Sequence, residues 1–319
     1  MPPYYTDAFS AYRKRGTRSR MGIALARPLP LWLLRVAWVT LPLTAGPAAS
    51  AALRDWSDAT RVVAEVLLWF AWGVGLLAAL APRPDTLTSL RVVAPALVLS
   101  AVLAALSGEP STLAAVVGVV ATLVCALLAS GHDITIAAAN AASYGDETRY
   151  PLRTPPALFL GPLPLARLLV AASFVAGPLL LADGEIIWGI VAVIVAVPVV
   201  YLLARSLIGL ASRWAVLVPA GFVVVDPFTL SDPHLFLREH LRWMAPVTAG
   251  AAPEGAVDLR LGATTGSIAV HFDETADLVR STPGRRGAET VHTDEICVAV
   301  VRHAELLRLA ADRRLPVRV

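Results

Sequence analysis

The strongest candidate for chemistry in this sequence is a small group of polar residues that follows a long apolar run. His132 and Asp133 are adjacent, and Asp146 and Glu147 come shortly after them. An imidazole beside carboxylates can build a metal site or an acid–base catalyst. A metal site needs three or four ligands with oriented neighbours, so one histidine beside scattered carboxylates favours a solvated cluster.

The remaining reactive residue types form no recognisable motif. The chain has no glycine-rich phosphate loop, no serine nucleophile elbow and no His-Glu-x-x-His pair. The two cysteines, Cys125 and Cys297, lie in different predicted domains, so we expect neither a disulfide nor a cysteine-based zinc site. We therefore predict no catalytic, metal-binding or cofactor-binding residue, and expect no cofactor.

We single out four charged residues that lie in or next to apolar runs, where an ionisable side chain is costly and usually functional. Each lies within one or two helical turns of a predicted helix end, where a long side chain can reach the membrane interface. Glu65 also follows Arg61 by four residues, a spacing at which an ion pair can form. A structural role is favoured for all four, which are Arg35, Glu65, Arg167 and Arg205.

The elements that must position these residues are mostly membrane helices. Hydrophobic residues make up 56% of the chain, charged residues only 16%, and the mean hydropathy is +0.65, values above those of soluble domains. The net charge of +3, without a basic patch that alternates with aromatic residues, excludes nucleic acid as a partner. Six apolar runs of near-spanning length occur, at 31–52, 62–80, 91–107, 112–130, 163–182 and 186–204.

The basic residues of the short connections predict the orientation. They gather on one side of the predicted membrane, together with a basic tail at 1–27, and this side is cytoplasmic by the positive-inside rule. We expect a multi-pass plasma-membrane protein with both termini in the cytoplasm and three tight helical hairpins. Twelve basic residues lie inside and two outside: Arg13, Lys14, Arg15, Arg18, Arg20, Arg27, Arg83, Arg91, Arg149, Arg153, Arg205 and Arg213 against Arg54 and Arg61.

Prolines within the spans allow two interpretations. They can interrupt helices around a transport site, or produce kinks whose freed carbonyls find other partners, and kinks are the commoner outcome. The segment Pro28-Leu29-Pro30-Leu31 is echoed by Pro162-Leu163-Pro164-Leu165, which a hairpin duplication or chance would explain. If the hairpin was duplicated, a transport cavity would be lined by spans one and five. The prolines concerned are Pro42, Pro47, Pro95, Pro178 and Pro198.

After Arg205 the pattern changes to short β-branched segments with turn residues, followed by a helix that starts near His303. The expected strands are 213–218, 222–226, 234–237, 257–261, 267–272 and 296–300, with a loop at 281–290. Strands closed by one helix favour a small barrel or sandwich. We predict a basic tail at 1–27, a transmembrane domain at 28–206 and a β-rich domain at 207–319.

The stretch from Arg213 to Asp226, a further strand and the closing helix resemble bacterial pleckstrin-homology-like (PH-like) domains. The Pro-Leu-Pro-Leu-Trp stretch, Arg149 to Arg153 and the Val-Pro-Ala-Gly-Phe turn resemble a family of actinobacterial membrane proteins that brings no known activity. Inositide binding in PH-like domains is usually assigned to basic residues at the first hairpin turn. The turn here, Pro219-Ala220-Gly221, has none, so the resemblance implies contact with a protein.

The fold class predicted is thus an α-helical membrane bundle of six spans with a C-terminal β-rich, PH-like domain closed by one helix. Its partners would be the lipid bilayer and a cytoplasmic protein bound through residues 212–319. The leading function is a membrane scaffold or adaptor. A small-solute transporter or permease is the alternative, and a membrane enzyme acting near His132, Asp133 and Glu147 is the weakest possibility.

Overall fold

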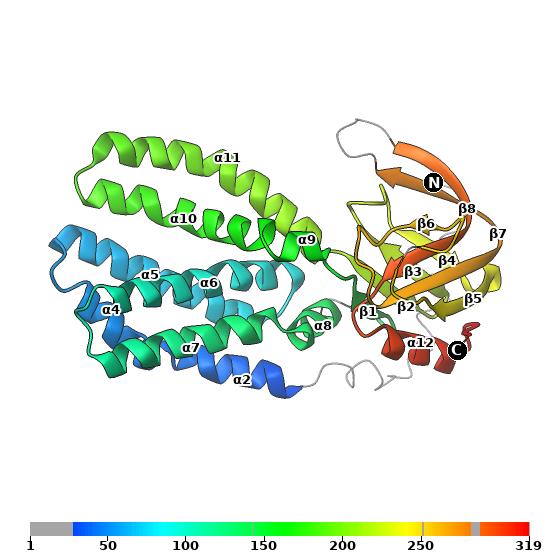
Figure 1. The fold of residues 1–319 in the computed structure, drawn as a ribbon, viewed down its shortest axis with the longest axis horizontal. Helices are drawn as coiled ribbons and strands as arrows, with labels where there is room; N and C mark the ends of the chain where they lie inside the picture. Colours follow the sequence, from blue (N-terminus) through cyan, green and yellow to red (C-terminus); the bar gives the residue numbers. More distant parts are fainter. Residues whose placement is uncertain (1–27, 142, 251, 282–287, 319) are drawn as a thin grey trace.

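The computed structural model describes residues 28–141, 143–250, 252–281 and 288–318. A bundle of helices occupies one half of the molecule, and a strand-rich unit is attached to one end of it (Figure 1). The predicted basic tail at 1–27 lies outside the described residues, as does most of the loop expected at 281–290.

Within the described residues, five helices are long and apolar enough to cross a membrane by length and composition. The chain therefore forms a multi-pass membrane bundle, in agreement with the prediction. Serine side chains begin two of these helices, because Ser57 and Ser111 accept hydrogen bonds from the amides of Thr60 and Ala114. The five are α5 (Asp58–Leu80), α6 (Pro84–Leu106), α7 (Thr112–Ser130), α10 (Pro162–Ala182) and α11 (Ile186–Ala211).

The first predicted span, 31–52, is not one helix in the structure. It is interrupted at Thr40 and Ala45, in the region of Pro42 and Pro47. Both residues keep helical backbone angles, and the amides of Thr44 and Ala49 still donate to the carbonyls four residues earlier, so the chain stays helical through this interruption, which we refer to as the break. Proline has no amide hydrogen and its ring crowds the carbonyl four residues earlier, so two prolines five residues apart disrupt a single helix. The three resulting pieces are α2 (Pro28–Val39), α3 (Leu41–Thr44) and α4 (Gly46–Ala52).

The other span prolines behave differently. Pro95, Pro178 and Pro198 each lie inside a continuous helix, α6, α10 and α11 respectively. The kink interpretation therefore fits these isolated prolines, while the pair in the first span interrupts its helix at two residues whose backbone stays helical.

A short helix, α8 (His132–Ala141), joins the bundle to the strand-rich unit. Gly131 has extended backbone angles, so α8 is separate from α7 and does not prolong it. Ile134 and Ala138 of α8 belong to the bundle core, whereas Ala139 packs with Trp214 and Val216 of the sheet. Because one ten-residue helix is buried on both sides, the two parts of the molecule are held together.

The first sheet is antiparallel with strand order β1-β2-β3-β4. Strand β1 comes from the connection between α8 and α10, inside the range assigned above to the transmembrane domain, and pairs along β2, with Tyr150 opposite Ala215. The strand-rich unit is therefore assembled from two separate stretches of the chain. The strands are β1 (Thr148–Pro151), β2 (Trp214–Val218), β3 (Gly221–Val225) and β4 (His234–Leu237).

The second sheet has strand order β5-β7-β8-β6, in which only the β6–β8 pair is parallel. Helix α12 (His303–Asp312) buries Leu306, Leu307 and Ala310 in the core that the strands share, so it closes the unit as predicted. A 3-10 turn, η2 (Arg238–His240), precedes β5. The strands are β5 (Leu241–Pro246), β6 (Val257–Asp258), β7 (Ser267–Ser281) and β8 (Ala288–Ala299).

A buried ion pair fixes the point where α11 enters the first sheet. Arg213 donates from Nε to Asp226 Oδ1 at 2.9 Å and from Nη2 to Oδ2 at 2.8 Å. Its Nη1 also donates to the carbonyl oxygen of Arg153 at 3.0 Å. One guanidinium thus links the last membrane helix, the end of β3 and the chain that follows β1.

Candidate functional site

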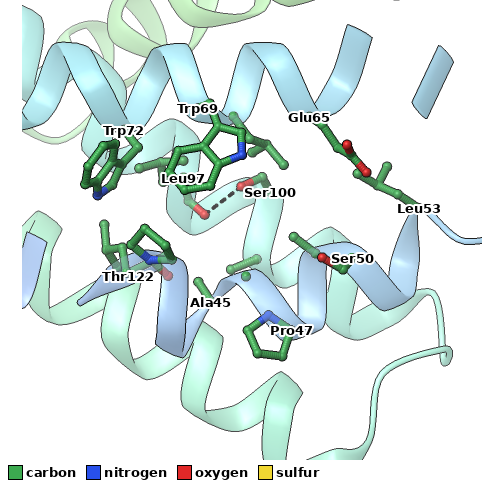
Figure 2. Close-up of a pocket in the computed structure, with 16 residues that line it drawn as sticks. Ala45, Pro47, Ser50, Leu53, Glu65, Trp69, Trp72, Leu97, Ser100 and Thr122 are labelled. Atoms are coloured by element: carbon green, nitrogen blue, oxygen red, sulfur yellow. Dashed lines mark hydrogen bonds between the residues drawn. The ribbon is translucent and has the colours of Figure 1, made fainter. Parts of the chain in front are cut away.

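The break in the first span lies beside a cavity in the bundle. The cavity has a volume of about 460 Å³ and is bounded by α3, α4, α5, α6 and α7. Trp72 lies at one end of it, and Glu65 and Leu53 lie at the other (Figure 2). A pocket of this size is typical of small-molecule sites.

Two tryptophans hold the broken helix against α5. The indole N–H of Trp38 donates to the carbonyl oxygen of Trp72 at 2.9 Å, and the indole N–H of Trp72 donates to that of Trp38 at 2.9 Å. Gly75 makes room for this arrangement, since a Cβ at Gly75 would collide with the Trp38 ring. The wall of the cavity nearest the break is therefore fixed in place.

Glu65 is the one charged residue among the described residues that line the cavity. Within the described part of the chain its carboxylate has no hydrogen bond or ion pair. The Arg61–Glu65 pair considered from the sequence does not form, because Arg61 pairs with Asp58 at 2.8 Å, one turn closer to the start of α5. A carboxylate seven residues inside a membrane helix without a partner is a candidate binding group.

Hydroxyl groups supply the other polar atoms of the cavity. Ser100 donates to the carbonyl oxygen of Leu97 at 2.9 Å (Figure 2), and Thr122 donates to that of Gly118 at 2.9 Å. Since these protons are used within their own helices, the hydroxyl oxygens present lone pairs to a ligand. Acceptor oxygens and a carboxylate favour a ligand that carries a positive charge or N–H groups.

An aromatic wall completes the cavity. The rings of Trp69 and Trp72 meet edge to face, with centroids 5.4 Å apart and planes at 87°. Both side chains line the cavity, together with prolines, alanines and leucines. A tryptophan face attracts a cation, so the wall and the Glu65 carboxylate favour the same ligand charge.

The polar cluster predicted from the sequence does not form. Asp133 pairs with Arg302, and Glu147 pairs with Arg149 at 2.7 Å. The side chain of Arg313 donates to the backbone carbonyl oxygen of Asp146 at 2.7 Å. Asp133 is thus paired with an arginine far away in the sequence and Glu147 with one two residues away, and the three carboxylates do not gather into one site with His132.

His132, the remaining member of the predicted cluster, lies at a different cavity, where α8 meets β1 and α10. Desolvation lowers the pKa of its imidazole, and the positive charges of Arg153, Arg91 and Arg302 lower it further. Among the described residues, no three His, Cys, Asp or Glu side chains lie together as a metal site would require. The structure offers a cationic surrounding for His132 in place of the expected carboxylates.

Of the charges inside apolar runs, Arg35 has the structural role that the sequence favoured. It donates from Nε to the carbonyl oxygen of Ala79 at 3.0 Å and from Nη2 to that of Leu80 at 3.2 Å. These are carbonyls of the last turn of α5, which have no partner within the helix. Glu65 lines the cavity, a position that the sequence analysis did not predict, and its distance of two turns from Asp58 was the only signal.

Comparison of the chain with protein-family models, with curated proteins and with solved structures finds no match.

Proposed function

We propose that this protein binds a small, mainly apolar solute with a positive charge in the bundle cavity and acts as a transporter or permease for it. The observation that carries the proposal is the Glu65 carboxylate, which has no partner among the described residues and lines a cavity beside a membrane helix interrupted by two prolines. Helices interrupted beside a site within the bilayer recur in secondary transporters, and Pro42 and Pro47 interrupt the first span beside this cavity. The solute alternative therefore takes precedence over the adaptor that the sequence favoured.

The cavity differs from the one expected for this function. A duplicated hairpin would have placed spans one and five around the site, but the lining residues come from the broken helix and from α5, α6 and α7. Thr122 and Trp69 lie near the middle of their helices, so the cavity reaches the middle of the bundle. The proposal thus rests on the first four spans and not on the repeat.

The proposal includes six membrane crossings, with α2, α3 and α4 together forming the first. These three pieces and their two connecting residues cover Pro28 to Ala52, a length comparable to the other spans. With the basic residues of the connections counted as above, the strand-rich unit and both termini lie in the cytoplasm and the membrane is the plasma membrane.

The test uses the purified full-length chain in lipid nanodiscs and benzyltrimethylammonium as the probe. Wild-type protein should bind this cation more tightly than neopentylbenzene, its uncharged carbon analogue. Glu65→Gln should raise the dissociation constant for the cation by about tenfold or more, because a charge-assisted contact is lost. Glu109→Gln, on the α6–α7 connection, is the matched control and should bind as wild type does.

Equal affinity of the wild type and Glu65→Gln for the cation would contradict the binding proposal. Transport is tested separately in proteoliposomes loaded with the unlabelled cation, by the exchange of external labelled cation. Binding without exchange would retain the site and remove the transporter role.

The adaptor remains a second proposal, favoured by the outer edge of the first sheet. Strand β4 pairs only with β3 among the described strands, and Leu235 and Leu237 on it are 44% and 38% exposed. An apolar edge strand is a surface onto which a partner can add a strand. The closing helix α12 and the two sheets also support the inference that the unit is PH-like.

Crosslinking in cells tests the adaptor. The double variant Leu235→Arg and Leu237→Arg should lose a partner that the wild type retains, while Leu261→Arg, equally exposed but away from β4, should keep it. An unchanged set of crosslinked proteins would count against recruitment through this edge.

A further inference from the structure

A second cavity lies where the bundle meets the strand-rich unit, and we refer to it as the junction pocket. Its volume is about 390 Å³, and its lining comes from α6, α8, the chain around β1, α10 and loops of the second sheet. Three arginines and one histidine line it, Arg91, Arg153, Arg167 and His132, and no described lining residue is an aspartate or glutamate.

The arginines of the junction pocket interact with one another. Electrostatic interactions link Arg91 with Arg167, and His132 with both Arg91 and Arg153. The nearest carboxylate on α8, that of Asp133, is already paired with Arg302. Like charges gathered without a counter-ion are unfavourable, so the pocket is suited to an anion.

Several donors in the pocket are free to receive that anion. Arg91 donates from Nε to the carbonyl oxygen of Ala129 at 3.1 Å and from Nη2 to the hydroxyl of Thr135 at 2.6 Å. These two hydrogen bonds hold the guanidinium in one orientation. The side chain of Arg167 makes no hydrogen bond or ion pair within the described residues. An oxyanion site needs guanidinium groups that are held in place and have N–H donors to spare. Arg91 meets the first requirement and Arg167 the second.

Arg153 adds a buried donor that lacks a partner. Its Nε is buried and makes no hydrogen bond, although its backbone N–H donates a hydrogen bond to the carbonyl oxygen of Ala299 at 2.8 Å. Gly266, with φ of +70°, allows this approach, because a Cβ there would lie 2.7 Å from Arg153 Nε. A buried guanidinium nitrogen without an acceptor is costly unless a ligand supplies one.

The position of the pocket along the helices indicates which anion would reach it. Arg91 lies about 10 Å along α6 from Pro84, and Arg167 about 8 Å along α10 from Pro162, so both are near one boundary of the membrane. Phe159 and Leu160 line the same pocket and are 57% and 87% exposed. Charged donors at this depth beside exposed apolar side chains suit a phosphate group attached to acyl chains.

We propose that the junction pocket binds a phosphate group, carried by the headgroup of an anionic phospholipid. The phosphate oxygens would accept from Arg153, Arg167 and the free N–H groups of Arg91, while Phe159 and Leu160 contact the acyl chains. Because Arg91 and Arg167 belong to the bundle and Arg153 follows β1, the bound headgroup joins the two parts of the molecule. This proposal is independent of the solute site, which shares no lining residue with it.

The test is native mass spectrometry of the delipidated full-length protein in detergent, titrated with dioctanoyl phosphatidic acid. Wild-type protein should bind this lipid at least tenfold more tightly than dioctanoyl phosphatidylcholine. Arg167→Gln and Arg153→Gln should each raise the dissociation constant for phosphatidic acid by about tenfold or more. Arg205→Gln is the matched control, an exposed arginine of α11 outside the pocket, and Glu65→Gln should also leave the affinity unchanged.

The variants must first show the same thermal unfolding as the wild type. Arg167→Lys is a milder variant, because it retains the charge but loses the planar guanidinium, and its affinity for phosphatidic acid should be intermediate. Displacement of phosphatidic acid by inorganic phosphate at equal concentration would keep the phosphate site and assign it to a soluble phosphate. Equal affinities of Arg153→Gln, Arg167→Gln and Arg205→Gln for phosphatidic acid would overturn the proposal.

Discussion

Trp38 and Trp72 exchange hydrogen bonds, each indole N–H donating to the backbone carbonyl oxygen of the other residue at 2.9 Å. The carbonyl of Trp38 would ordinarily receive the amide four residues later, but that residue is Pro42, which has no amide hydrogen. The Trp72 indole supplies the missing donor. In a membrane, where water does not replace a lost bond, this exchange stabilises the break that forms one wall of the cavity.

Replacing Trp72 with phenylalanine should therefore destabilise the bundle. The carbonyl of Trp38 would be left without its donor, at a cost of about 1–3 kcal/mol. The matched control is Trp69→Phe, because Trp69 lines the same cavity but its indole makes no hydrogen bond within the described residues. Chemical unfolding in detergent measures both, and equal losses in the two variants would contradict the assigned role.

The buried cysteines provide a convenient readout for such experiments. Cys297 is fully buried, and desolvation raises the pKa of its thiol to about 11. The reactive thiolate is therefore scarce at neutral pH until the strand-rich unit unfolds. Labelling of Cys297 by iodoacetamide should follow unfolding of this unit and should be slow in the native protein.

Gly75→Ala tests the packing around the Trp38 ring. A methyl group at Gly75 would collide with this ring, and overpacking of this kind costs about 1–3 kcal/mol. Gly73→Ala is the control on the same helix, because a Cβ there has no neighbour within 4 Å. Stability measured by thermal unfolding should fall for Gly75→Ala only. A similar fall for both variants would show that replacing glycine, and not the collision with Trp38, lowers the stability.

The Arg213–Asp226 pair should be far more important than the exposed pairs of the surface. Its side chains are 1% and 0% exposed, so Asp226→Asn leaves a buried guanidinium without its counter-charge and should cost about 3–5 kcal/mol. Asp58→Asn, which removes the exposed Arg61–Asp58 pair, should change stability by less than about 1 kcal/mol. Similar effects of the two substitutions would be inconsistent with this account.

Acid should weaken the strand-rich unit partly through Asp258. Hydrogen bonds from the Arg260 side chain hold the pKa of the Asp258 carboxyl below its usual range. A carboxyl with a lowered folded-state pKa contributes stability above about pH 4, and this contribution is lost as the pH falls through the folded-state value. Asp258→Asn should flatten the acid limb of the stability profile, whereas an unchanged limb would exclude this carboxyl as a cause.

Much of the architecture could be predicted from local pattern. Helices such as α7 are long apolar runs between polar turns. Strands β2, β3 and β4 are short, mostly apolar segments between turn residues. Length and composition were therefore enough to locate these elements. Strand β1 could not be found in this way, because a four-residue segment, Thr148–Pro151, becomes a strand only by pairing with β2 more than 60 residues later. Strand β5 was also missed. Its pairing with β7 is irregular between Leu241 and Trp243.

The candidate sites were less predictable than the fold. His132 and Asp133 are adjacent in the sequence, but Asp133 faces Arg302, which lies 169 residues away, and His132 faces arginines from α6 and the β1 connection. Proximity in the sequence thus indicated a carboxylate cluster where the tertiary structure assembles a cationic pocket. Pro42 was recognised as a candidate break, but the cavity depends on Trp72 and Gly75, which are on another helix.

The measurement that tests the central claim most directly is photoaffinity mapping of the solute site in nanodiscs, with an azide derivative of benzyltrimethylammonium and peptide mass spectrometry. We predict adducts on α4 and on α5 around Glu65 and Trp69. Excess unlabelled cation should prevent these adducts, and Glu65→Gln should greatly reduce them. Adducts confined to lipid-facing residues of α10 and α11, or unaffected by competitor and by Glu65→Gln, would contradict a solute site in the bundle cavity.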